Sequence, residues 1–318
     1  MNHIINVMRA ELFKAARKRR TYIFAAMAWL ISPAILLTIG IVTDINVAQQ
    51  DFEGAEIAAT VINALASPVG MARINLVLMV YFAGFLTIVL ALIAALFMGE
   101  ERSQNMWKTV LVAQPNRVQT LCGKILSGMI LMFFFFLGSI LSALLIGGIG
   151  TFFLPTSFQG DWGSLLGLYA LQWSYCLAML LFAYLMVALV RNNALGIVSV
   201  IFVPSLAENV YRILRFVLDL EPIRNNFTAM LRFMQFRENF ENIPKYFLTH
   251  NFSAPARFTG LNSAELQETG IAEEIFGDSS SVFSDLFVAD LQQASIVMAV
   301  YALIFGALLF WRFTRQDI

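Results

Sequence analysis

The sequence predicts an all-α membrane protein with six transmembrane helices. Hydrophobic residues make up 59% of the 318 positions and charged residues 13%, whereas soluble domains have roughly 45–50% and 25%. A chain of this composition cannot cover itself with polar surface in water, so lipid is its expected solvent. A spanning helix needs about 20 mostly apolar residues. The uncharged stretches are 21–43, 74–98, 125–160, 162–190, 192–207 and 291–311, of which only the fifth is short.

Residues 1–20 predict an amphipathic helix at the cytoplasmic membrane interface. Its apolar residues recur at helical spacing, at Ile5, Met8, Leu12 and Ala16. A basic cluster at 17–20 precedes the first span, which is too long for the ~7–15 residues of a signal-peptide core and is expected to remain as a helix. The cluster is typical of an interfacial helix beside anionic lipid; nucleic-acid binding is not expected of a membrane chain with net charge +0.

Basic residues in the short connections predict the orientation. One side of the expected bundle carries thirteen, whereas the short loops opposite carry Arg73 alone. Short basic loops remain in the cytoplasm, so both termini are predicted to be cytoplasmic. The thirteen are Arg9, Lys14, Arg17, Lys18, Arg19, Arg20, Arg102, Lys108, Arg117, Lys124, Arg191, Arg312 and Arg315.

The loop 99–124, between the second and third spans, carries the most conspicuous polar signal. Ser103 is placed to cap a helix that runs to about Ala113, and Pro115 stops it. Glu100 and Glu101 lie just before this helix. One flank of the helix is apolar and consists of Met106, Trp107, Val110 and Leu111. Such a flank favours a helix that docks on a partner over a plain connector.

The segment after residue 207 carries a charged stripe that steps along one helical face: Glu208, Arg212, Arg215 and Asp219. The favoured interpretation is a surface helix at the outer interface. The alternative extends the fifth helix, with the stripe facing an aqueous vestibule, because charges at membrane depth usually face a cavity or a partner. Short helices are expected in the external segment 208–290.

The sequence contains no recognisable catalytic pattern. It lacks HExxH, GxSxG, a CxxC pair and the phosphate-binding loop GxxxxGK[ST]. With two histidines and two cysteines, neither a metal site nor a disulfide framework is predicted. We therefore expect a chain that is not an enzyme and binds no cofactor. An intramembrane enzyme, a scaffold or regulatory protein without transport activity, and an ion-coupled secondary transporter remain alternatives.

Several of these features together resemble the ABC-2 type permease family. They are Glu11-Leu12-Phe13-Lys14, the acidic end of the second span, Met106-Trp107-Lys108-Thr109, Pro115-Asn116-Arg117 and Lys124. The resemblance implies a permease that pairs with a second permease chain, as a homodimer or heterodimer, and docks two cytoplasmic ATP-binding subunits. Those subunits, and not this chain, would hold ATP and Mg²⁺.

The resemblance also assigns roles along the chain. Glu100, Glu101, the helix 103–113 and Arg117 would transmit the movement of the ATP-binding subunits. The implied activity is most often export across the cell inner membrane. The expected organisation is an interfacial helix at 1–20, five spans with the coupling loop at 21–207, an external segment at 208–290, and the sixth span with a cytoplasmic tail at 291–318.

Overall fold

The computed structural model describes residues 2–47, 62–63, 65–81, 84–99, 117–158, 160–190, 192–219, 242–259 and 290–315, whose regular elements are all helices. For Arg212, Arg215 and Asp219 it describes the backbone alone. Within these residues, five helices are long and apolar enough to cross a membrane. The bent pair Pro68–Tyr81 and Phe85–Gly99 makes a sixth if the two helices count as one span. The all-α membrane fold is thereby confirmed. The five are Thr21–Ile45, Arg117–Gly150, Trp162–Leu189, Asn193–Tyr211 and Leu291–Arg315.

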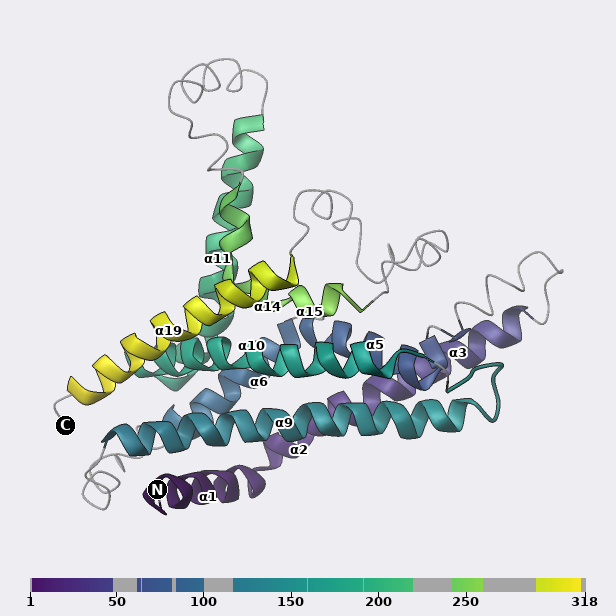
Figure 1. Cartoon of the computed structure of the whole chain (residues 1–318), viewed down its shortest axis with the longest axis horizontal. Coiled ribbons are helices and arrows are strands. Elements are labelled where there is room, and N and C mark those ends of the chain that lie inside the picture. Colours follow the sequence, from purple (N-terminus) through teal and green to yellow (C-terminus); the bar gives the residue numbers. More distant parts are fainter. Residues whose placement is uncertain are drawn as a thin grey trace.

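Helix α10 (Trp162–Leu189) lies at the centre of the bundle. It packs against α9 (Arg117–Gly150), α11 (Asn193–Asp219) and α19 (Leu291–Arg315), and Figure 1 shows α9 and α10 running along the long axis of the molecule. In its most apolar 18-residue stretch 67% of the residues are buried, against 17% for α19. A helix that is apolar all round is suited to this central position.

The start of α10 is fixed by a side-chain cap. The Asp161 carboxylate accepts a hydrogen bond from the Ser164 backbone N–H at 3.0 Å, which satisfies one of the free donors of the first turn. Hydrogen bonds from Ser164 hold the pKa of this carboxyl below its ordinary value.

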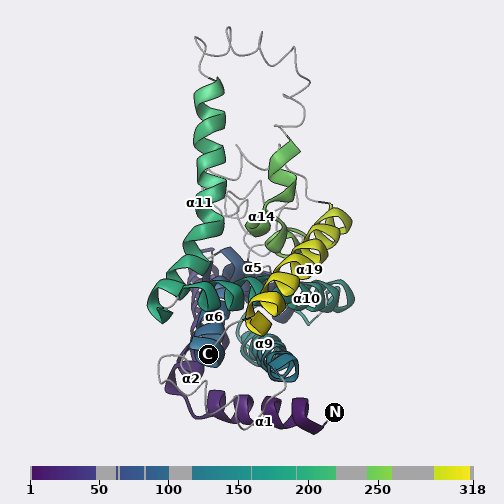
Figure 2. The ribbon, with the colours of Figure 1, turned by 90° about the vertical axis from the view of Figure 1, so that its left-hand side faces the viewer.

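The amino-terminal helix α1 (Asn2–Ala16) lies against α9, below it in Figure 1 and along the lower edge of Figure 2. Its most buried face carries Val7, Glu11 and Ala15, which step by four. The face predicted from Ile5, Met8, Leu12 and Ala16 lies beside it and is less buried, with Ala16 exposed. The chain then continues through α2 (Arg19–Ala26), the π-helical segment η1 (Met27–Ile31) and α3 (Ser32–Val47), which together form the first span.

The second span, expected at 74–98, is a bent pair of helices. Helix α5 (Pro68–Tyr81) is followed by α6 (Phe85–Ala94) and the π-helical segment η4 (Ala95–Gly99), with an angle of 63° across the break. Gly84 precedes α6 with φ of 62°, a left-handed conformation that glycine adopts without steric cost. The single glycine within an apolar run therefore redirects the chain.

Helix α11 runs without a break past Ala207, where a change to a separate surface helix was favoured. It includes Pro204 and ends at Asp219. Figures 1 and 2 show it rising away from the other long helices. The charged stripe is thus an extension of the fifth span, and the expected boundary at 207/208 falls inside one helix.

Part of the segment before the last span folds back onto the bundle as short helices. These are η5 (Ile243–Tyr246), α14 (Leu248–Phe252) and α15 (Ala254–Arg257). Three hydrogen bonds fasten them: Gln172 Nε2 donates to the Phe252 carbonyl at 3.0 Å, Tyr301 Oη to the Tyr246 carbonyl at 2.7 Å, and Arg257 Nε to Tyr81 Oη at 2.7 Å. Segments far apart in sequence are thereby joined to α5, α10 and α19.

Candidate functional site

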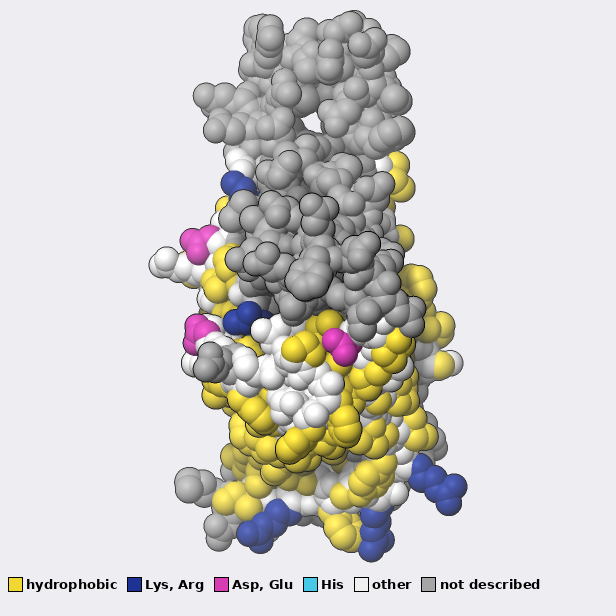
Figure 3. Space-filling view, turned by 90° about the vertical axis from the view of Figure 1, so that its right-hand side faces the viewer, with side chains coloured by type: hydrophobic (Ala, Val, Ile, Leu, Met, Phe, Trp, Pro, Cys, Tyr) yellow, Lys and Arg dark blue, Asp and Glu magenta, His cyan; other side chains and the backbone are white. Residues whose placement is uncertain are grey.

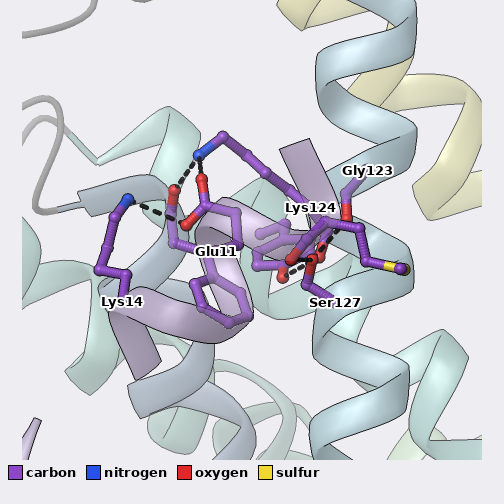
Figure 4. Close-up of polar contacts among 8 residues, drawn as sticks. Glu11, Lys14, Gly123, Lys124 and Ser127 are labelled. Atoms are coloured by element: carbon purple, nitrogen blue, oxygen red, sulfur yellow. Dashed lines mark hydrogen bonds and ion pairs between the residues drawn. The ribbon is translucent and has the colours of Figure 1, made fainter. Parts of the chain in front are cut away.

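A buried ion pair joins α1 to α9 close to the loop 100–116. Lys124 has no exposed surface and Glu11 is 4% exposed. The Lys124 ammonium pairs with Glu11 Oε1, as Figure 4 shows. It also donates to the Phe97 carbonyl of η4 at 2.6 Å. One side chain therefore connects three elements, two of which flank the loop directly.

The Glu11 carboxylate is compensated on both oxygens. Lys14 Nζ lies 2.9 Å from Oε2, while Lys124 occupies Oε1. Burying an unpaired carboxylate or ammonium costs several kcal/mol, so these charges are retained only because each one meets its partner. Such a pair adds little net stability but fixes one arrangement of the helices. Its consequence is a defined position of α1 on α9.

The close approach of α1 to α9 depends on a glycine beside the lysine. A Cβ atom at Gly123 would lie 2.8 Å from Val7 Cβ, too close for any other residue without displacement of α1. Ser127 Oγ donates to the Gly123 carbonyl at 2.7 Å and contacts the Met8 carbonyl at 3.3 Å. The two helices thus meet backbone to backbone.

Two further contacts extend this junction to α10 and α19. Tyr184 Oη, on α10, donates to the Lys124 carbonyl at 3.0 Å. Arg117 Nη1, at the start of α9, donates to the Thr314 carbonyl in the last turn of α19 at 3.1 Å, where a cation also complements the helix dipole. We call the set Glu11, Phe97, Arg117, Lys124 and Tyr184 the loop junction, because it ties η4, which ends at Gly99, to α9, which begins at Arg117.

Of the predicted coupling residues, the structure describes only Arg117. Glu100, Glu101, Met106, Trp107, Val110 and Leu111 lie outside the described residues, and their role stays a prediction. Arg117 is described and lies in the loop junction. The sequence also marked Glu11 and Lys124, as parts of separate motifs, but not their pairing. A usable signal was present, since Glu11 is the single carboxylate in residues 1–43 and belongs to an otherwise basic helix.

The stripe predicted as a possible vestibule is described in part. Glu208 accepts a hydrogen bond from the Thr249 hydroxyl of α14 and is therefore turned toward the folded-back segment. Arg212, Arg215 and Asp219 share the helix α11 with it, but their side chains lie outside the described residues.

In the part of the chain that the structure describes, no group of three or more His, Cys, Asp or Glu residues is placed to bind a metal ion. Cys176 is buried and Cys122 partly buried, and both are free thiols. The described residues of the loop junction supply a charge pair, backbone carbonyls, the Tyr184 hydroxyl and the Arg117 guanidinium, which can hold helices together.

Comparison with known proteins identifies the family. The family model described as "ABC-2 family transporter protein" matches residues 7–206, from the first turns of α1 to the middle of α11. The match includes the whole loop junction and ends before the folded-back short helices. Among curated proteins, no sequence matches the chain. Because the matched residues form most of the chain and all but one of its spans, the protein belongs to the ABC-2 family of transporter membrane proteins.

Proposed function

We propose that this chain is the permease subunit of an ATP-driven exporter. In this proposal ATP is hydrolysed by separate cytoplasmic subunits, and the chain converts their movement into translocation of a solute. The support is family membership together with the architecture at one end of the bundle. The family is a membrane component of transporters and not a catalytic one.

The observation that carries the proposal is the position of Lys124. Its ammonium contacts Phe97, three residues before Glu100, and Glu11 of the amino-terminal helix. A helix at 103–113 that is pushed by a partner would transmit the push through η4 and α9, the segments on either side of it. The charge pair would carry the same displacement to α1. Movement of a short loop would in this way become movement of spanning helices.

The proposed partners are two ATP-binding subunits and a second permease chain, surrounded by membrane lipid. Purification of the tagged chain in detergent, followed by mass spectrometry of the co-purifying subunits, tests this composition. We expect an ATP-binding protein among them. Transport that needs an ion gradient and no ATP would favour a secondary transporter, and a complex without any flux would favour a scaffold.

The docking role of the predicted helix 103–113 has its own test. Trp107→Ala removes a large residue of the type that dominates interfaces, where the loss can reach about 2 kcal/mol or more. We expect Trp107→Ala and Glu101→Lys each to weaken association with the ATP-binding subunit while the permease remains inserted. The matched control is Phe152→Ala, which changes an aromatic side chain that is 85% exposed, just beyond the far end of α9. Full association and full transport in both loop variants would rule the dock out.

We further propose a multi-pass protein of the inner membrane with both termini in the cytoplasm. The support is the distribution of lysine and arginine in the short connections. Asn116→Cys and Ser280→Cys, each introduced after replacement of Cys122 and Cys176, distinguish the two sides. In intact cells an impermeant thiol reagent is expected to label position 280 and not position 116. The opposite pattern would invert the topology.

The charged stripe of α11 is proposed to line an outer vestibule. The contact of Glu208 with Thr249 supports this, because it turns the start of the stripe toward other protein segments. We expect Arg212→Glu/Arg215→Glu to lower flux at unchanged abundance and unchanged ATP hydrolysis. Wild-type flux in this variant would mean that the stripe does not line the vestibule and that its charges form only surface ion pairs, each contributing ~0–1 kcal/mol to stability.

A further inference from the structure

We propose that the exposed face of α1 and α2 is a binding surface for anionic phospholipid headgroups. The surface consists of Arg9, Phe13, Arg17, Arg19, Tyr22 and Ile23, all of them exposed. We call it the basic face. It lies opposite the Val7–Ala15 side of α1 that contacts α9, and it takes no part in the loop junction.

The charge of this face is uncompensated within its own segment. Glu11 is the one carboxylate in residues 1–43, and it points inward to Lys124 and Lys14. In Figure 3, Lys and Arg side chains gather along the lower edge of the molecule, the edge formed by α1 and α2 in Figures 1 and 2, and no Asp or Glu is visible beside them. A surface of this kind attracts anions at short range.

Three residues of the basic face, two in α1 and one just after it, lie in one line along the helix. Arg9, Phe13 and Arg17 follow one another at intervals of four, which places them on one side of a helix. The Arg17 guanidinium lies 4.2 Å from the centroid of the Phe13 ring, a cation–π distance. An apolar ring that carries a guanidinium on its face suits the boundary between acyl chains and headgroups.

The corner between α1 and α2 is held by side chains, so the cations on both helices keep a fixed relation. Tyr22 Oη donates to the Ala16 carbonyl at 2.6 Å, and Thr21 Oγ1 to the Ala15 carbonyl at 3.0 Å. Both carbonyls belong to the last turn of α1, which has no helical donors of its own. Arg17 and Arg19 therefore present their charges from an ordered turn.

Lipid, and not an acidic protein, is the occupant that the apolar residues indicate. Phe13, Tyr22 and Ile23 are each exposed by 58–61% and lie among the arginines. Beyond Ile23 the exposed apolar surface continues along the first span, through Met27, Leu30, Ile31, Ile35, Ile39 and Val42. A face that passes without interruption into the acyl-chain surface of a span lies where phospholipid headgroups are. Tyrosine is also typical of that depth.

The test uses the purified full-length chain in neutral detergent micelles, with phosphatidylglycerol labelled by dansyl on an acyl chain. Binding is followed by energy transfer from the tryptophans. Each basic residue near an anionic membrane contributes about a fivefold factor in binding, so Arg9→Gln/Arg17→Gln is expected to weaken it by on the order of 30-fold. Arg9→Lys/Arg17→Lys should retain most of the binding. Lys245→Gln, which removes an exposed cation on η5, is the matched control and should bind like wild type.

Four results would overturn the proposal. The first is unchanged phosphatidylglycerol binding in Arg9→Gln/Arg17→Gln. The second is equal binding of dansyl-labelled phosphatidylcholine, and the third is competition by glycerol phosphate at the concentration of the lipid. The first two would remove the headgroup preference, and the third would indicate a site for free phosphate. The fourth is a double variant that keeps its lipid binding but loses an associated ATP-binding subunit, which would make the basic face a protein interface. Weaker binding in 0.5 M salt, by contrast, is expected of exposed charges, because the screening length is about 8 Å at 0.15 M and shortens further as salt is added.

Discussion

The two π-helical segments, η1 and η4, each have a backbone carbonyl that accepts a hydrogen bond from another helix, but the two donors differ. In η1 the Ser32 N–H bonds to the Met27 carbonyl, one residue further back than in an α-helix, which leaves the Ala28 carbonyl to accept Asn75 Nδ2 at 3.4 Å. In η4 the Phe97 carbonyl accepts Lys124 Nζ at 2.6 Å. A carbonyl of each π-helical segment thus accepts a hydrogen bond from a buried side chain of another helix.

The donors differ in charge and in what else they hold. Asn75 is neutral, and its amide also donates to Ser139 Oγ at 2.6 Å. Lys124 is cationic and needs Glu11 for compensation. A neutral contact fixes helices at low cost, whereas a buried charge pair makes three elements dependent on one another. The comparison therefore predicts that η4, beside the loop 100–116, is the segment whose disturbance spreads furthest.

Lys124→Met should have the largest effect. It leaves the Glu11 carboxylate buried without its main partner and the Phe97 carbonyl without its donor, and breaking a buried pair costs about 3–5 kcal/mol. Thermal unfolding in nanodiscs measures the loss. The double variant Glu11→Gln/Lys124→Met should recover part of it, since the unpaired charge is gone. A double variant as unstable as the sum of the single ones would mean that the two side chains do not interact.

Gly123→Ala should follow with a loss of about 1–3 kcal/mol, the usual cost of overpacking. The new methyl group would meet Val7 at 2.8 Å and force α1 away from α9. Gly167→Ala on α10 is the control, because a Cβ atom there meets nothing within 4 Å. Equal stability of the two variants would show that α1 has room to move on α9.

Asn75→Leu should have the smallest effect, about 1 kcal/mol, as is typical of hydrogen bonds between spanning helices. The substitution removes the bonds to Ala28 and Ser139 but also a buried amide oxygen, Oδ1, which has no partner among the described residues. The same unfolding measurement applies. A loss as large as that of Lys124→Met would make the two π-helical segments equivalent and remove the distinction between them.

The sequence predicted the spans well where composition alone decides them. The fourth was expected at 162–190 and is Trp162–Leu189, and the sixth was expected from residue 291 and begins there. The bend of the second span was not predicted, because hydropathy carries no information about the left-handed backbone of Gly84. The length of α11 was underestimated, because four charged residues on one face resemble the end of a span although the helix continues.

The loop junction could be predicted only in its parts. Glu11 and Lys124 were visible as polar residues beside apolar runs, but they are 113 positions apart in the chain. Their pairing depends on how α1 lies on α9, which in turn depends on the close approach at Gly123. No local pattern contains that information. The contact of Arg117 with the last turn of α19 is equally remote in sequence.

The most direct test of the account is the amount of solute transported per ATP hydrolysed in the reconstituted complex. Lys124→Met is compared with Asn75→Leu at a temperature where both are folded and inserted to the same extent. We expect Asn75→Leu to keep the wild-type ratio, whereas Lys124→Met should continue to hydrolyse ATP but transport at least about tenfold less per ATP, a change of roughly 1.4 kcal/mol in coupling. A wild-type ratio in Lys124→Met would contradict the claim that the loop junction transmits the movement.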